Sequence, residues 1–145
     1  METLHFTVNI NAPKEKVWTC LWQDENYRKW TSAFFEGSHA VSDWKEGSKI
    51  LFLSPSGEGM YSTIDKLVPN EFMAFKHHGI VKDGKEQPMD EETKKWSGAM
   101  ETYDLKENNN QTEVTVRVDI TEDHKDYFLN AFPKAMNILK ELAES

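Results

Sequence analysis

Two neighbouring histidines, His77 and His78, are the side chains of this sequence that best suit acid–base chemistry or metal binding. They lie in a stretch that reads as a strand, where successive side chains point to opposite faces. The two rings therefore cannot easily share one ion, and no Cys, Asp or Glu stands beside them at a ligand spacing. We predict no metal site and no cofactor. We expect one of the two histidines to face an internal site, and we assign His78.

The other reactive side chains give weaker signals. Cys20 lies among apolar helix residues, which predicts a buried, inert thiol. The carboxylates of residues 90–92 lack the apolar surroundings that would raise their pKa, so we interpret them as solvated. There is no Ser-His-Asp order, no glycine-rich phosphate loop and no HExxH motif. A cofactor-free enzyme would have to transfer protons through His78, Tyr61 or Tyr103.

Aromatic and methionine side chains recur in a way that suits the lining of an apolar site, because methionine adapts its shape to varied ligands. The alternative is that they only fill the core, and the sequence leaves both interpretations open. With His78, the predicted ligand-binding residues are Trp30, Phe34, Met60, Met100, Phe128, Phe132 and Met136.

The elements that would position these residues follow from hydrophobic periodicity. Residues 4–10 alternate apolar and polar side chains, which predicts a half-buried strand. Two short helices follow, over about 14–22 and 24–34. The sequence then predicts strands near 37–44, 48–54, 59–68, 71–81, 97–106 and 111–121. Short connections with Asn, Gly and Pro indicate antiparallel neighbours, and the charged segment 82–95 is expected to be a solvated loop.

The C-terminal segment from about 123 to 143 has an apolar stripe at helical spacing. Such a helix is about 30 Å long and can cross a whole sheet. Pro133 lies inside it and removes one backbone hydrogen bond, so we expect a kink or a break into two segments there. The prediction is an α+β domain over residues 1–145, in which an antiparallel sheet of about six or seven strands holds a long C-terminal helix.

Composition excludes several classes of function. The formal net charge is −8, with 17 basic against 25 acidic residues, so nucleic acid is not expected as a partner. The single cysteine excludes an internal disulfide. No apolar run approaches the roughly 20 residues that span a bilayer, and the N-terminus does not resemble a secretory signal. We therefore expect a cytoplasmic protein without membrane insertion.

Three stretches give the chain a family resemblance. INAPKEKVWTCLWQDENYRKW is similar to the opening of the SRPBCC (START-like, Bet v 1-like) superfamily. YFLNAFPKAMNILKELAE resembles the closing helix of its branch related to the activator of heat-shock protein 90 ATPase. Gly59-Met60-Tyr61 and Pro69-Asn70-Glu71 resemble the central hairpin of that branch. The resemblance covers essentially the whole chain and implies the helix-grip fold.

This resemblance also implies a cavity between the sheet and the final helix, in which superfamily members carry lipids, hormones or polyketides. Our leading hypothesis is a non-enzymatic protein that binds a small apolar or aromatic ligand there. An alternative is a co-chaperone-like interaction domain with a chaperone partner and a role in stress responses. A third is a cofactor-free enzyme that acts in the cavity. We expect no counterpart here of the separate N-terminal domain of the full-length eukaryotic activators.

Overall fold

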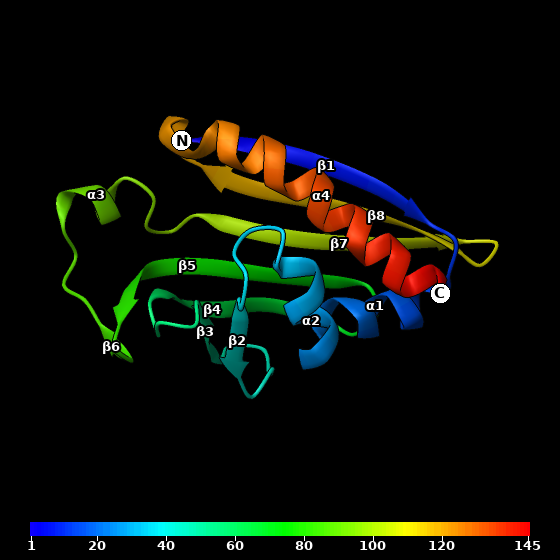
Figure 1. Ribbon diagram of the computed structural model, residues 1–145, viewed down its shortest axis with the longest axis horizontal. Coiled ribbons are helices and arrows are strands. Elements are labelled where there is room, and N and C mark those ends of the chain that lie inside the picture. The colour runs from blue at the N-terminus through cyan, green and yellow to red at the C-terminus, as the bar shows by residue number, and fades with distance from the viewer.

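A curved antiparallel sheet wraps around the C-terminal helix in the computed structural model, which describes residues 1–145 (Figure 1). The strand order is β1-β8-β7-β5-β4-β3-β2, and β6 pairs with β5 as an eighth strand. Two short helices follow β1 and lie on the same side of the sheet as the final helix, α4. The predicted α+β helix-grip architecture is confirmed.

The elements have the following bounds. The strands are β1 (Glu2–Ile10), β2 (His39–Ser42), β3 (Lys49–Leu53), β4 (Gly59–Val68), β5 (Phe72–Lys82), β6 (Lys85–Glu86), β7 (Met100–Asn108) and β8 (Gln111–Ile120). The helices are α1 (Lys14–Trp22), α2 (Asp24–Thr31), α3 (Glu91–Lys94) and α4 (Lys125–Glu144), with a 3-10 turn, η1 (Glu122–His124), before α4.

Side-chain alternation explains why β8 and its neighbours pair as they do. The side chains that point from β8 into the core are those of Val114, Val116, Val118 and Ile120. Strand β8 pairs with β1 along one edge and with β7 along the other. A slip of one residue would turn this whole row towards solvent, so the register is strongly specified.

Helix α4 runs in the same direction as β1 and is tied to it at both ends. Lys125 Nζ lies 3.0 Å from Glu2 Oε1, and Lys140 Nζ donates to the Asn9 carbonyl at 2.8 Å. The C-terminal half of α4 comes close to β1 and α1 because small side chains, Ala135 and Ala143, lie at the contact. The helix is thus anchored most tightly by its second half.

Of the kink or break expected at Pro133, the break does not occur: α4 is one continuous helix from Lys125 to Glu144. Pro133 is exposed on the outer side of the helix, and so is Leu129, whose carbonyl loses its partner. Water can reach that carbonyl, so the missing bond costs little.

The segment 82–95 also differs from the predicted loop. It contains β6 and the one-turn helix α3, which Asp90 caps by accepting a hydrogen bond from the Thr93 amide at 2.8 Å. The carboxylates of residues 90–92 are exposed, as expected. Charged, exposed side chains predominate in this segment, and Thr93 is the only buried side chain of α3. No hydrophobic pattern in the sequence therefore indicates this short helix.

Candidate functional site

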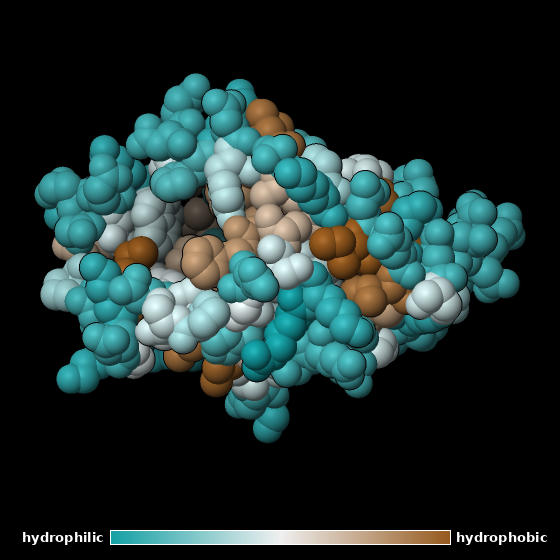
Figure 2. Space-filling model, viewed as in Figure 1, coloured by the Kyte–Doolittle hydropathy of each residue, from teal (hydrophilic) through white to brown (hydrophobic).

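A cavity of about 380 Å³ lies between the sheet and the N-terminal half of α4. Figure 2 shows a hollow in this face of the molecule, bordered by pale and brown side chains below the N-terminal part of α4. Hydrophobic residues make up 14 of the 21 that line the cavity. A few polar side chains in a mostly apolar wall are typical of small-molecule sites.

The lining comes from every layer of the fold. Tyr27, Trp30 and Thr31 belong to α2, and Phe34 and Ser38 to the loop that follows. The sheet contributes Phe52, Met60, His77, Ile80, Glu101, Tyr103, Val118, Asp119 and Ile120. The remaining lining residues are Trp96, Ala99, Thr121, His124, Tyr127, Phe128 and Phe132.

Aromatic side chains of α4 pack between this half of the helix and the sheet. Phe132 is 2% exposed, stacks on Phe6 with ring centroids 4.8 Å apart and meets the edge of Phe34 at 4.7 Å. Phe128 lies one turn earlier, 5.8 Å from Phe132 between centroids. Both rings line the cavity, whereas the small Ala135 and Ala143 of the other half are fully buried away from it.

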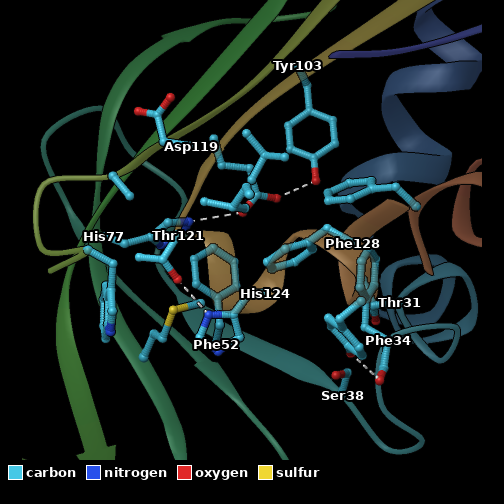
Figure 3. A pocket seen from close by; sticks show the side chains of 18 of the residues that line it. Thr31, Phe34, Ser38, Phe52, His77, Tyr103, Asp119, Thr121, His124 and Phe128 are labelled. Atoms are coloured by element: carbon cyan, nitrogen blue, oxygen red, sulfur yellow. Dashed lines mark hydrogen bonds and ion pairs between the residues drawn. The ribbon is translucent and has the colours of Figure 1, made fainter. Parts of the chain in front are cut away.

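Three polar side chains of the cavity, those of His77, Glu101 and Tyr103, form a connected network. The Glu101 carboxylate accepts from His77 Nε2 at 3.0 Å on one oxygen and from the Tyr103 hydroxyl on the other. Figure 3 draws these two hydrogen bonds of His77 and Tyr103 as dashed lines. On its other side, His77 Nδ1 lies 2.7 Å from Ser62 Oγ.

The hydrogen bonds define the state of the neutral imidazole. A carboxylate can only accept, so Nε2 carries the proton and Nδ1 accepts from the Ser62 hydroxyl. Both ring nitrogens of His77 are therefore occupied. Ser62 is completely buried and does not line the cavity, so no substrate carbonyl in the cavity can reach its oxygen. Although Ser62, His77 and Glu101 meet in space, they form a structural network and not a nucleophilic triad.

Alternation along β5 places His77 on the inner face with Met73 and Phe75, and an irregularity in the β4–β5 pairing follows directly after it. Tyr61 pairs with Gly79 but Ser62 pairs with His77, so His78 has no direct partner and the register shifts there. Such bulges re-aim side chains near functional sites. His78 lies on the outer face, where its Nε2 is 3.0 Å from Thr63 Oγ1 and its ring stacks on Tyr61.

Two cavity tyrosines are held in their neutral form. Burial, then the negative charge of Glu101 and then the hydrogen bond to it raise the pKa of Tyr103 well above 10.0. Burial, followed by the Glu101 charge, likewise raises the pKa of Tyr27 well above 10.0. Tyr27 is 8% exposed, and its hydroxyl makes no hydrogen bond within the protein. Its hydroxyl is therefore free to bond a ligand, as are Ser38 Oγ and Trp96 Nε1 among the lining residues.

Further polar contacts lie where α4 begins. Thr121 Oγ1 is 2.9 Å from His124 Nδ1, and the Tyr127 hydroxyl donates to the Phe34 carbonyl at 2.5 Å (Figure 3). The second bond ties α4 to the loop after α2. Because Tyr127 and Phe34 both line the cavity, this bond closes part of its rim.

Five of the eight predicted ligand-binding residues line the cavity: Trp30, Phe34, Met60, Phe128 and Phe132. His78, Met100 and Met136 do not. Met100 alternates with Glu101 on β7 and so points to the other face of the sheet. Met136 is 4% exposed in the tightly packed half of α4.

Of the proton-transfer candidates, only Tyr103 faces the cavity, whereas Tyr61 lies with His78 on the outer face. Cys20 is 6% exposed, and burial raises the pKa of its thiol, as expected of an inert cysteine. No group of three or more His, Cys, Asp or Glu side chains is placed to hold a metal ion. The expectation of no metal stays a prediction.

The sequence analysis missed His77, Glu101 and Tyr27 as cavity residues. For His77 the signal was present, since alternation groups it with Met73 and Phe75. The same rule groups Glu101 with Tyr103 and Leu105 on the inner face of β7. No comparable signal identified the free hydroxyl of Tyr27, because its lack of a partner depends on the tertiary arrangement.

The sheet, the gripped helix and the cavity define a helix-grip domain of the SRPBCC, Bet v 1-like class. Within that class, the chain belongs to the family described as Activator of Hsp90 ATPase homolog 1-like protein, which it matches over residues 11–144. No curated protein matches the chain. None of its helices is both long enough and apolar enough to cross a bilayer.

Solved structures share the fold. The Aha1 dimer from Colwellia psychrerythraea, solved in solution, has a TM-score of 0.75 and 23% identity, with 99% of this chain and 97% of that chain covered. MLL2253 from Mesorhizobium loti has a TM-score of 0.72 and 15% identity, with 97% and 96% covered. DynU16, from the dynemicin biosynthetic locus, has a TM-score of 0.71 and 14% identity, with 100% of this chain and 48% of that chain covered.

Proposed function

We propose that this protein binds a small apolar or aromatic ligand in the cavity between the sheet and the N-terminal half of α4. The observation that carries the proposal is the cavity itself, about 380 Å³ in volume with a mostly hydrophobic lining. That volume lies within the range of small-molecule sites, about 300–1,000 Å³. A space of this size in a well-packed interior loses dispersion contacts, which a ligand of suitable shape would restore.

The polar network favours binding over hydrolysis. His77 is committed at both nitrogens, and Ser62 is out of reach of the cavity. A general base needs a free acceptor within reach of the proton it removes. The network instead keeps the one carboxylate of the inner sheet face at a defined position, where it can orient a ligand.

A fluorescence titration with N-phenyl-1-naphthylamine, a neutral apolar probe, tests the proposal. We expect saturable binding to the protein, and at least about tenfold weaker binding to Ala99→Leu, whose larger side chain takes up cavity space. Leu129→Ala is the control, because Leu129 is 46% exposed on α4 and outside the cavity. If Leu129→Ala weakens binding and Ala99→Leu does not, the probe binds the surface and the proposal is wrong.

Protein binding is the second candidate function, and family membership favours it. Phe35 and Tyr127 are exposed by 58% and 48%, and Tyr127 packs against Phe34, the neighbour of Phe35. These rings could contact a chaperone of the Hsp90 class. A pull-down tests this function: the immobilised protein should retain purified Hsp90 from the same source, and Phe35→Ser should not. Retention that Phe35→Ser leaves unchanged would exclude this surface.

A further inference from the structure

The charged residues of the cavity are all acidic. Glu101 and Asp119 line it, and none of the 21 lining residues is Lys or Arg. The Asp119 carboxylate accepts from Thr3 Oγ1 on β1 and from the Met100 amide, so Glu101 supplies the carboxylate that faces the space. The whole chain carries a net charge of −8, which adds to the negative potential. The two lining histidines are both engaged, His77 with Glu101 and His124 with Thr121. An anionic ligand would find no cation to pair with in this cavity.

Glu101 keeps hydrogen-bonding capacity for a ligand. Each of its carboxylate oxygens accepts one bond from the protein, one from His77 and one from Tyr103, while each has a second lone pair. Its side chain is 19% exposed, although it lies among apolar walls. Hydrogen bonds from a charged donor to a carboxylate are about twice as strong as neutral ones.

The surrounding rings suit a positive charge. Tyr27, Trp30, Phe52, Trp96 and Tyr103 all line the cavity together with Glu101. The faces of aromatic rings attract cations, by about 0.5–2 kcal/mol according to how far the cation is desolvated. A carboxylate beside several aromatic faces is therefore a better site for an ammonium group than for a neutral or anionic group.

A second, independent observation also points to a ligand. Tyr27 lines the cavity, and its hydroxyl forms no hydrogen bond with the protein. The fully buried polar side-chain atom without a partner is Trp22 Nε1, so the Tyr27 oxygen stays accessible and is free to accept a hydrogen bond from a ligand. An ammonium N–H could donate to this oxygen while another N–H of the same group donates to Glu101.

We propose that the cavity selects apolar ligands that carry a protonated amine, with the ammonium group at Glu101 and Tyr27 and the apolar body against the rings. This proposal rests on the proposed function, since it specifies the ligand of the same cavity. The amine binds as an ion by hydrogen bonds and charge, and no covalent step is involved.

Three ligands with the same naphthalene body test the proposal: 1-naphthylmethylamine, the neutral 1-ethylnaphthalene and the anion 1-naphthaleneacetate, titrated calorimetrically at neutral pH and physiological salt. We expect the amine to bind about tenfold more tightly than the neutral compound. The acetate should bind about tenfold more weakly than the neutral compound. Glu101→Gln should remove the advantage of the amine. Glu113→Gln, the same change at an exposed position of β8, should leave it intact. Tyr27→Phe should weaken the amine about threefold and leave the neutral compound unaffected.

The outcomes separate this inference from the proposed function. If none of the three compounds binds, both proposals are overturned. If the neutral compound or the acetate binds as tightly as the amine, the cavity binds apolar ligands but the charge preference is wrong. The ranking is measured on the unmodified protein, so it decides the question even if Glu101→Gln fails to fold.

Discussion

His77 on β5 and Glu101 on β7 meet across two neighbouring strands, with Nε2 3.0 Å from Oε1 and side chains only 6% and 19% exposed. The pair lies in a cavity with a mostly hydrophobic lining. Its position follows from the strand register, because His77 and Ala99 pair through the backbone and Glu101 is the next inward-facing residue along β7. The sheet thus presents one oriented carboxylate to the space below α4.

The two adjacent histidines should differ sharply in their effect on stability. His77→Ala removes the partner of both Ser62, which is completely buried, and Glu101. Leaving buried polar groups unsatisfied costs about 1–3 kcal/mol, so urea denaturation should show a loss of that size. His78→Ala, on the outer face, should cost less than about 1 kcal/mol. Equal losses would mean that His77 is not embedded as described.

Phe132 should be among the most important side chains for the grip of α4 on the sheet. It is 2% exposed and stacks on Phe6 at 4.8 Å, so Phe132→Ala should lower the free energy of unfolding by about 3–5 kcal/mol. Leu129→Ala, at an exposed position of the same helix, should change it by less than about 0.5 kcal/mol. Urea unfolding of both variants checks the contrast, and a small loss for Phe132→Ala would contradict it.

The same substitution at two buried alanines should separate the cavity from the packed core. Ala99 is 3% exposed and lines the cavity, whereas Ala135 is fully buried where α4 packs tightly. Ala99→Leu should change stability by less than about 1 kcal/mol, since the added carbons enter open space. Ala135→Leu should destabilise by about 1–3 kcal/mol through overpacking. Thermal or urea unfolding measures both, and a reversed order would place the space elsewhere.

Stability should fall at alkaline pH because of Tyr27 and Tyr103. The pKa values of both are raised well above 10.0 by burial first and by Glu101 second. The folded state therefore favours the neutral phenol more than the unfolded state does. Its contribution to the free energy of unfolding is complete below the unfolded-state pKa, about 10, and is lost as pH rises through the folded-state pKa. Urea midpoints from about pH 8 to about pH 11 should therefore decline above about pH 10.

Replacing Tyr27 or Tyr103 by Phe should make that decline shallower. The ultraviolet absorbance of tyrosinate gives a separate check, because the two buried tyrosines should ionise only when the protein unfolds. Complete tyrosine ionisation of the folded protein near pH 10 would contradict the assignment.

Periodicity was enough to predict the sheet, the two short helices and α4. Each of these elements has one buried face, and a period of two or 3.6 reports that face directly. The segment 82–95 was misread because β6 and α3 bury almost nothing, so no periodicity marks them.

The site was harder to predict than the fold. Phe128, Phe132 and Met136 belong to the same stripe of α4, but only the first two line the cavity. The position of the cavity depends on side chains from several elements, which a single helical pattern does not contain. Met136→Trp should accordingly overpack the core and not fill the cavity. The choice between His77 and His78 depended on strand alternation, which favoured His77.

The measurement that tests the central claim most directly is a methyl NMR titration of the protein with 1-methylnaphthalene. The methyl groups of Ile80, Ala99, Val118 and Ile120 line the cavity, whereas those of Val41, Ile138 and Leu142 do not. We predict saturable ring-current shifts in the first group and none in the second. Shifts confined to the second group, or none that saturate, would contradict binding in the cavity.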